Sequence, residues 1–150
     1  VRIEFSRILT SYHELASQSD EVIVEGAGGF LVPLNEKKDS ADLAVELGLP
    51  VILVVGMRLG CLNHALLTMR VIADYELECA GWVANVLDAE MPALQQNVDA
   101  LRERIAAPLL GVIPYQIRPD AKAAAGYLDS DLLGASTSAS SASEMTGQDD

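Results

Sequence analysis

The run Val51-Ile52-Leu53-Val54-Val55, which follows Pro50, is the feature that most limits how this chain can fold. Five consecutive apolar residues, most of them β-branched, favour a strand. A strand in which apolar and polar residues do not alternate is typical of a parallel sheet that is covered on both faces. The run therefore predicts a strand buried on both faces, with helices packed on either side of its sheet.

Other parts of the chain repeat this pattern of a short apolar strand followed by a helix. Apolar spacing predicts helices over residues 3–17, 40–47, 62–76 and 92–105, and strands over 21–25, 81–85 and 109–113. The second helix has Asp39 or Ser40 as its N-cap and Gly48 as its stop. Strands that alternate with helices form right-handed crossovers. We expect an α/β fold with a mostly parallel sheet and helices on both faces.

Composition excludes several classes of function. Half of the 150 residues are apolar, which is enough to bury the core of one domain, yet no apolar run approaches the roughly 20 residues of a membrane span. A net charge of −12 argues against nucleic acid and anionic membranes, which both need clustered Lys and Arg. Two cysteines, Cys61 and Cys79, fit a reducing compartment. We expect a cytoplasmic protein that binds neither nucleic acid nor membrane.

The two ends of the sequence differ from its body. Residues 1–5 contain no initiator Met and no secretion signal, which favours a partial chain. Residues 134–150 are small, polar and acidic, without periodicity, and we expect them to be disordered. The predicted organisation is a partial α/β domain at 1–133 and an acidic, serine-rich tail at 134–150.

Candidate ligand contacts follow the predicted strands, because parallel sheets bind ligands at the carboxyl ends of their strands. A carboxylate at Glu25 can hold Mg²⁺, and the glycines after it allow the backbone to approach phosphate oxygens. A charged strand end followed by a tight turn is the alternative interpretation. The chain contains neither a Walker A loop nor a dinucleotide-binding fingerprint.

Two further segments carry polar groups after predicted strands. The loop before the 62–76 helix has glycines and a helix N-terminus that suit an anion. Its Cys61 and His64 lack the partners of a metal site and the oxyanion hole of a nucleophile, so a packed thiol and a first-turn histidine are favoured. The Asn85 amide can satisfy a donor and an acceptor of adenine, or it can simply sit in a turn.

Four blocks together resemble the dethiobiotin synthetase family, in the family's order and spacing. They are VEGAGGFLVPL (24–34), LPVILVVGMRLGCLNHALLT (49–68), AGWVAN (80–85) and APLLGVIPY (107–115). The resemblance implies a fold like that of the P-loop NTPases, which makes 1–133 a partial nucleotide-binding domain. It also implies that the chain corresponds to the C-terminal two-thirds of the family, without the N-terminal strands and the phosphate-binding loop.

The resemblance implies an ATP- and Mg²⁺-dependent cyclo-ligase of biotin biosynthesis. Such an enzyme carboxylates 7,8-diaminopelargonate with CO₂, phosphorylates the carbamate and closes a ureido ring to give dethiobiotin, ADP and phosphate. Phosphoryl transfer depends mainly on positioning and charge neutralisation, so no nucleophile is required. Because the phosphate-binding loop is missing, we expect the 150 residues alone to be inactive.

The resemblance also assigns site residues. Glu25 would bind Mg²⁺ and would contact the ATP phosphates together with Gly26, Ala27 and Gly28. The adenine and nucleoside contacts would be Asn85, Val86, Pro114, Tyr115, Gln116 and Asp120. Four residues of one subunit of a homodimer would reach the substrate carboxylate bound by the other subunit: Leu59, Gly60, Cys61 and Asn63.

Three alternatives stand beside this interpretation. A non-catalytic nucleotide-binding switch of the same superfamily would carry a basic amphipathic helix, which this sequence lacks. An ATP-dependent amide synthetase acting on a corrinoid would have a glutaminase domain where residues 134–150 stand. A pure interaction module would use the sheet without nucleotide. The missing N-terminal strand that the resemblance to dethiobiotin synthetase implies would leave part of the sheet uncovered, which predicts low stability and aggregation.

Overall fold

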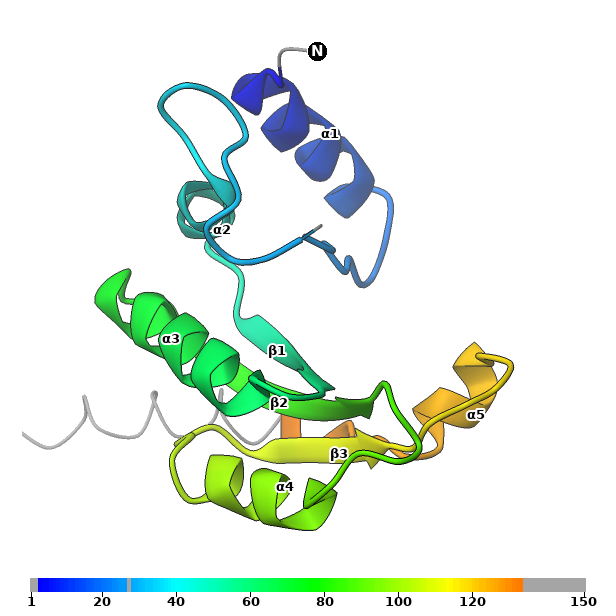
Figure 1. Ribbon diagram of the computed structural model, residues 1–150. Coiled ribbons are helices and arrows are strands. Elements are labelled where there is room, and N and C mark those ends of the chain that lie inside the picture. The colour runs from blue at the N-terminus through cyan, green and yellow to red at the C-terminus, as the bar shows by residue number, and fades with distance from the viewer. Residues whose placement is uncertain (1–2, 27, 134–150) are drawn as a thin grey trace, which may run out of the picture.

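A computed structural model describes residues 3–26 and 28–133 (Figure 1). Ala27 and the predicted tail at 134–150 lie outside the described residues. The elements in chain order are α1 (Phe5–Ala16), α2 (Ser40–Leu47), β1 (Val51–Met57), α3 (Cys61–Asp74), β2 (Cys79–Val86), α4 (Leu94–Arg102), β3 (Leu109–Ile113) and α5 (Ala121–Ala125).

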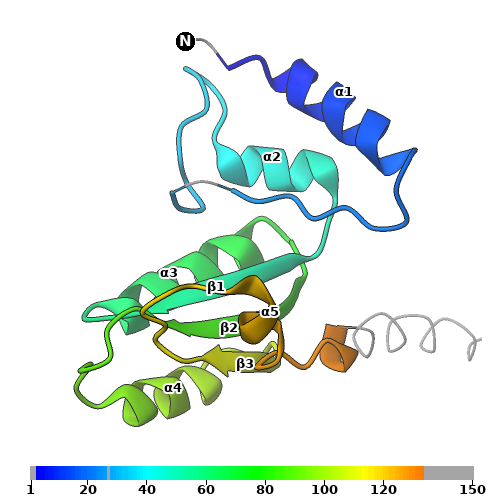
Figure 2. The ribbon, with the colours of Figure 1, turned by 90° about the vertical axis from the view of Figure 1, so that its right-hand side faces the viewer.

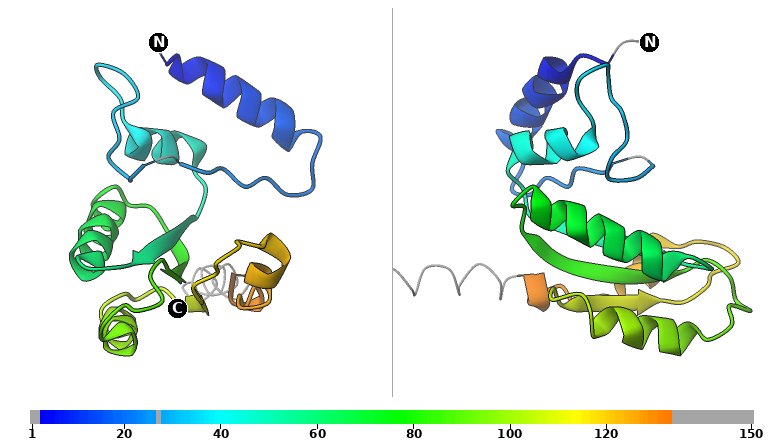
Figure 3. Two further views of the ribbon diagram at one scale, coloured as in Figure 1. Left: turned by 45° about the vertical axis from the view of Figure 1, so that its right-hand side comes forward. Right: turned by 60° about the vertical axis from the view of Figure 1, so that its left-hand side comes forward.

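The three strands form one parallel sheet in the order β1-β2-β3. Val54 of β1 pairs with Val83 of β2, which in turn pairs with Gly111 of β3. Helix α3 connects β1 to β2 and α4 connects β2 to β3, and both lie on one face of the sheet (Figure 3). The shorter α5 lies on the opposite face (Figure 2). The predicted α/β class, with a parallel sheet and helices on both faces, is confirmed.

The hydrophobic core lies between the sheet and helices α3 and α4. Its largest members, Trp82, Met57 and Leu101, expose no surface to solvent. Cys61 and Ala65 contribute from one side of α3, because residues four positions apart share a helix face. This packing makes α3, α4 and the sheet the most firmly held part of the molecule.

The second face of β1 differs from the sequence-based expectation. The apolar run predicted a strand buried on both faces, and that prediction was wrong for the face opposite α3. Ile52 is 45% exposed and Val54 is 59% exposed. Among the named helices of the described residues, the short α5 lies on this face, and it leaves both side chains in contact with solvent.

The strand predicted at residues 21–25 is also absent. These residues are neither helix nor strand, and Ile23 is 92% exposed. A strand requires a neighbour that accepts and donates its backbone hydrogen bonds. No described residue pairs with this segment, so its β-branched composition does not by itself produce a strand.

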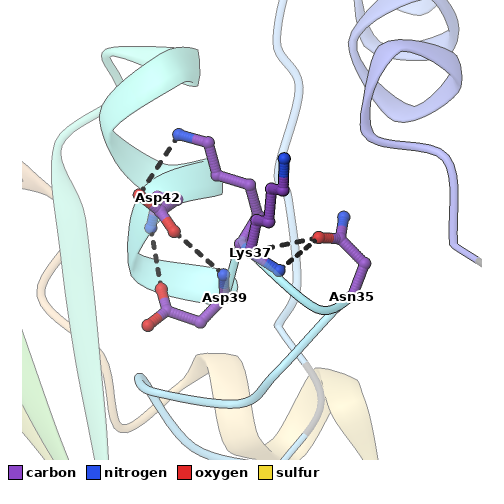
Figure 4. Close-up of polar contacts among 5 residues, drawn as sticks. Asn35, Lys37, Asp39 and Asp42 are labelled. Carbon is purple, nitrogen blue, oxygen red and sulfur yellow. Dashed lines mark hydrogen bonds and ion pairs between the residues drawn. The ribbon is translucent and has the colours of Figure 1, made fainter.

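Helix α2 begins with the predicted cap. The Asp39 carboxylate accepts a hydrogen bond from the Asp42 backbone N–H at 3.0 Å, and the Asp42 carboxylate accepts one from the Asp39 N–H at 3.0 Å (Figure 4). This reciprocal capping box satisfies two N–H groups that have no helical partner. Gly48 ends the helix in the left-handed conformation at φ 62°. Both predicted boundaries are confirmed.

Replacing Asp39 with Ala is expected to lower the free energy of unfolding by about 1 kcal/mol, because the Asp42 N–H loses its acceptor. Urea denaturation measures this loss, and Asp39→Ser, which keeps an acceptor, should recover most of it. A serine variant as unstable as the alanine variant would show that the cap bond contributes nothing.

Acid is expected to weaken the same cap. The hydrogen bond from the Asp39 N–H lowers the pKa of Asp42, and Lys38, whose Nζ lies 3.2 Å from the carboxylate, lowers it further. A lowered pKa means that the stabilisation is present at neutral pH and is lost as the pH falls below about 4. Stability measured from pH 7 to pH 3 should therefore fall less steeply in Asp42→Asn. An unchanged slope in that variant contradicts the prediction.

Candidate functional site

The carboxyl ends of the three strands meet at one edge of the sheet. Gly56 pairs with Asn85, Met57 pairs with Val86, and Asn85 pairs with Ile113. The loops that follow β1, β2 and β3 therefore leave the sheet side by side (Figure 2). This register brings Asn85 and Val86 next to the segment that begins at Pro114. It also brings them next to the loop between β1 and α3.

The loop between β1 and α3 is a tight turn held by its own backbone. Gly60 has a φ of 91° and caps α3, and the Cys61 N–H donates to the Arg58 carbonyl at 3.0 Å. Leu59 is 99% exposed, whereas the Cys61 side chain lies in the core. Any contact that Cys61 makes with a ligand must therefore use its backbone. Asn63, on the first turn of α3, is exposed.

The loop between β3 and α5 is held by a side-chain contact that the sequence did not indicate. The Gln116 Oε1 accepts a hydrogen bond from the Asp120 N–H at 2.8 Å. Asp120 Oδ1 accepts from the Ala123 N–H at 2.7 Å and caps α5, which leaves Oδ2 for a ligand. Pro114 is half-buried and Tyr115 is 46% exposed. Gln116 thus fixes the position of Asp120 relative to β3.

The glycine-rich segment after Glu25 is exposed. Gly28 has a φ of 95°, and a Cβ placed there would lie 3.1 Å from Val32 Cγ2. Both the backbone conformation and the close side chain require glycine at this position. Glu25, Gly26 and Gly28 all face solvent.

Ser40 anchors this segment to α2. Its hydroxyl lies 2.8 Å from the Phe30 carbonyl and 3.1 Å from the Gly29 carbonyl, and it accepts from the Val32 N–H at 3.0 Å. Sequence reasoning treated Ser40 only as a possible helix cap. The bonded groups lie 8 to 11 residues earlier in a loop, so no local pattern could have indicated the contact.

The structure does not bring the Glu25 segment to the other candidate residues. Among the described residues, no hydrogen bond or ion pair joins residues 25–29 to the loops after β1, β2 and β3. The described residues contain no group of three or more His, Cys, Asp or Glu side chains that could hold a metal ion. Glu25 is exposed and belongs to no such group.

A shallow cavity of about 350 Å³ lies at the opposite, amino-terminal edge of the strands. Burial raises the pKa of the Cys79 thiol in its wall, which keeps the thiol protonated at neutral pH. None of the predicted ATP contacts lines the cavity. Its lining residues are Met69, Ile72, Ala73, Leu77, Cys79, Ala106, Ala107 and Pro108.

A family model described as an AAA domain matches residues 1–123, which include every strand and most of the candidate site. The chain belongs to this AAA-domain family. The match extends from α1 into α5 and so takes in the three loops at the carboxyl edge of the sheet. Within the described residues of this AAA-domain protein, no helix is long and apolar enough to cross a membrane.

The AAA-domain chain is similar to several curated proteins named ATP-dependent dethiobiotin synthetase BioD. The protein of Aromatoleum aromaticum is 58% identical over 115 residues, which are 77% of this chain and 51% of the relative. That of Janthinobacterium sp. (strain Marseille) is 53% identical over 133 residues, 89% of this chain and 56% of the relative. The predicted resemblance is confirmed, and the chain spans about half the length of these relatives.

Proposed function

We propose that this chain is part of an ATP-dependent dethiobiotin synthetase. The observation that carries the proposal is the 58% identity over 115 residues to a protein of that name. The 115 matched residues are numerous enough to include most of the sheet and the loops at its carboxyl edge. The reaction proposed is the carboxylation of 7,8-diaminopelargonate with CO₂ and its ring closure to dethiobiotin, driven by ATP. The parent protein is thus a cyclo-ligase of biotin biosynthesis.

The adenine and nucleoside site in this proposal lies at the carboxyl edge of β2 and β3. Support comes from the register that sets Asn85 beside Ile113, so that the amide and the segment after β3 share one edge. Asn85 offers both a donor and an acceptor. The other contacts proposed are Val86, Pro114, Tyr115, Gln116 and Asp120.

The phosphate end of the proposed site uses Glu25 with Gly26, Ala27 and Gly28. An exposed single carboxylate suits Mg²⁺, which is commonly held by one or two carboxylates together with substrate phosphates and water. When bound, Mg²⁺ neutralises charge on the phosphates. The Gly28 backbone, which carries no Cβ, permits close approach of a phosphate oxygen.

The proposed homodimer uses the turn before α3. Leu59 is almost completely exposed there, which is unfavourable for a large apolar side chain unless a partner covers it. In the dimer, Leu59, Gly60, Asn63 and the backbone of Cys61 would reach the substrate carboxylate of the partner subunit. Two free cysteines, Cys61 and Cys79, support a cytoplasmic location.

A chimera tests the proposal. The matched region of the Aromatoleum synthetase is replaced by the corresponding residues of this chain, and dethiobiotin formation is measured with diaminopelargonate, bicarbonate, Mg²⁺ and ATP. We expect turnover, and we expect Glu25→Gln to lower it about 10- to 100-fold because a metal contact is lost. Glu36→Gln, at another exposed glutamate, is the matched control and should have no effect. A folded chimera that binds ATP without forming dethiobiotin would reject the proposed substrate.

A further inference from the structure

The Asp120 carboxylate offers an oxygen to a ligand in the loop that follows β3. Its Oδ1 accepts a hydrogen bond from the Ala123 N–H at 2.7 Å and caps α5. Among the described residues, no hydrogen bond or ion pair involves Oδ2, and the residue is exposed. An ionised carboxylate accepts hydrogen bonds and donates none, so Oδ2 suits a hydroxyl group of a ligand.

The segment before Asp120 is held at its ends rather than along its length. Ile117, Arg118 and Pro119 are exposed, and within the part of the chain that the structure describes none of them makes a hydrogen bond. The bond from the Asp120 N–H to Gln116 Oε1, at 2.8 Å, closes this loop. Without the Gln116 side chain, the three exposed residues would move more freely, and Asp120 would move with them.

The Gln116 side chain is engaged with Asp120 rather than with the base. The oxygen of a side-chain amide is its acceptor, so Oε1 must face the Asp120 N–H. Bidentate pairing with adenine would require that oxygen to face the base instead. The backbone of Gln116 is still available for a contact with the base, but its side chain can act on a nucleotide only through Asp120.

We propose that Gln116 is a positioning residue that makes the nucleotide site selective for the ribose, through the Asp120 carboxylate. With Gln116 in place, Oδ2 is held where it can accept a hydrogen bond from a ribose hydroxyl. Hydrogen bonds to a charged acceptor are about twice as strong as those between neutral groups, but they weaken steeply when the geometry is poor. This role rests on the proposed ATP site and adds to it the means by which the sugar is recognised.

The chimera with the Aromatoleum synthetase tests this role through its affinities for ATP and for dideoxy-ATP, which lacks both ribose hydroxyls. Titration calorimetry measures both affinities, and their ratio is decisive because a change that merely loosens the site weakens both nucleotides equally. We expect Gln116→Leu to weaken ATP binding about ten-fold and dideoxy-ATP binding by less than about two-fold. Gln116→Glu, which keeps an acceptor on a side chain of the same length, should retain most of the ratio.

Two further variants separate a positioning role from a general loss of structure. Asp120→Ser keeps an acceptor that can cap α5 but removes Oδ2. In that background Gln116→Leu should leave the ratio of affinities unchanged, because the two residues act as one unit. Gln18→Leu is the matched control, since Gln18 Nε2 also makes a hydrogen bond across four residues, to the Glu14 carbonyl at 3.1 Å beside the end of α1. It should leave both affinities unchanged.

The possible outcomes distinguish this role from the proposed function. If Gln116→Leu weakens both nucleotides equally, or neither, the ribose role is overturned even when the chimera forms dethiobiotin. A selective loss of ATP affinity without dethiobiotin formation would support the ribose role and reject the proposed substrate. A folded chimera that binds neither nucleotide would overturn both.

Hydrogen exchange in the full 150-residue chain tests the Gln116–Asp120 bond without any nucleotide. We expect the Asp120 amide to exchange about ten-fold faster in Gln116→Leu, because it loses its acceptor. Amides of β2 should exchange at the same rate in both proteins, which shows that the variant is folded. An Asp120 amide that exchanges equally fast with and without the Gln116 side chain would overturn the positioning role.

Discussion

Replacing Trp82 with Ala is expected to lower the free energy of unfolding by about 3–5 kcal/mol. The side chain is completely buried at the centre of the core, between β2 and helices α3 and α4. Its removal leaves a cavity that a close-packed interior does not fill by small movements. Because small domains are stable by only about 5–15 kcal/mol, a loss of this size removes a large share of the stability.

Urea denaturation followed by far-ultraviolet circular dichroism measures this effect without using tryptophan fluorescence. Tyr115→Ala is the control, because it removes an aromatic ring that is 46% exposed. Trp82→Phe should cost much less than Trp82→Ala, since the indole Nε1 is buried without a hydrogen-bond partner and phenylalanine removes that group. Similar losses for Trp82→Ala and Tyr115→Ala would contradict the assignment of Trp82 to the core.

Replacing Gly111 with Ala is expected to lower the free energy of unfolding by about 1–3 kcal/mol through overpacking. A Cβ at this position would overlap the Tyr127 backbone carbonyl and would lie 3.2 Å from Leu128 Cδ2. The segment that contains both residues is attached to β3, where the Asp129 N–H donates to the Leu110 carbonyl at 2.8 Å. Backbone cannot move aside as a flexible side chain can, so the segment must separate from the strand.

Hydrogen exchange of the Asp129 amide measures this separation. The exchange should become faster in Gly111→Ala, while exchange in β1 and β2 changes little. Gly29→Ala is the matched control, because a Cβ there meets nothing within 4 Å and its φ is not positive. A Gly111→Ala variant as stable as Gly29→Ala would show that residues 127–129 do not pack on β3 in solution.

Several elements could be predicted from the sequence because their signals are local. The Asp39 cap and the Gly48 stop define α2, and the apolar run after Pro50 defines β1. The strand predicted at 109–113 has the same limits in the structure. In each case a few neighbouring residues supply both the conformational preference and the boundary. The alternation of strands and helices along the chain predicted that the strands of the sheet are parallel.

The candidate site could be predicted only in part. Placing Asn85 and Pro114 at one edge required nothing beyond the rule that parallel strands end on the same side. The buried Cys61 side chain confirms the packed thiol that the sequence favoured. The Gln116–Asp120 hydrogen bond depends on how a loop folds back, and no periodic pattern in the sequence indicates it.

Residues 21–25 and the open face of β1 show what the tertiary structure alone decided. Both segments have the composition of buried strands, and the sequence alone determined that preference. Whether such a segment becomes a strand, and whether both of its faces are covered, depends on a partner that is distant in the chain or outside it. A backbone hydrogen bond between strands needs a second strand, and an apolar side chain is buried only when another part of the structure packs on it. A preference within one segment therefore sets which structure it can adopt, and its neighbours decide whether it adopts that structure.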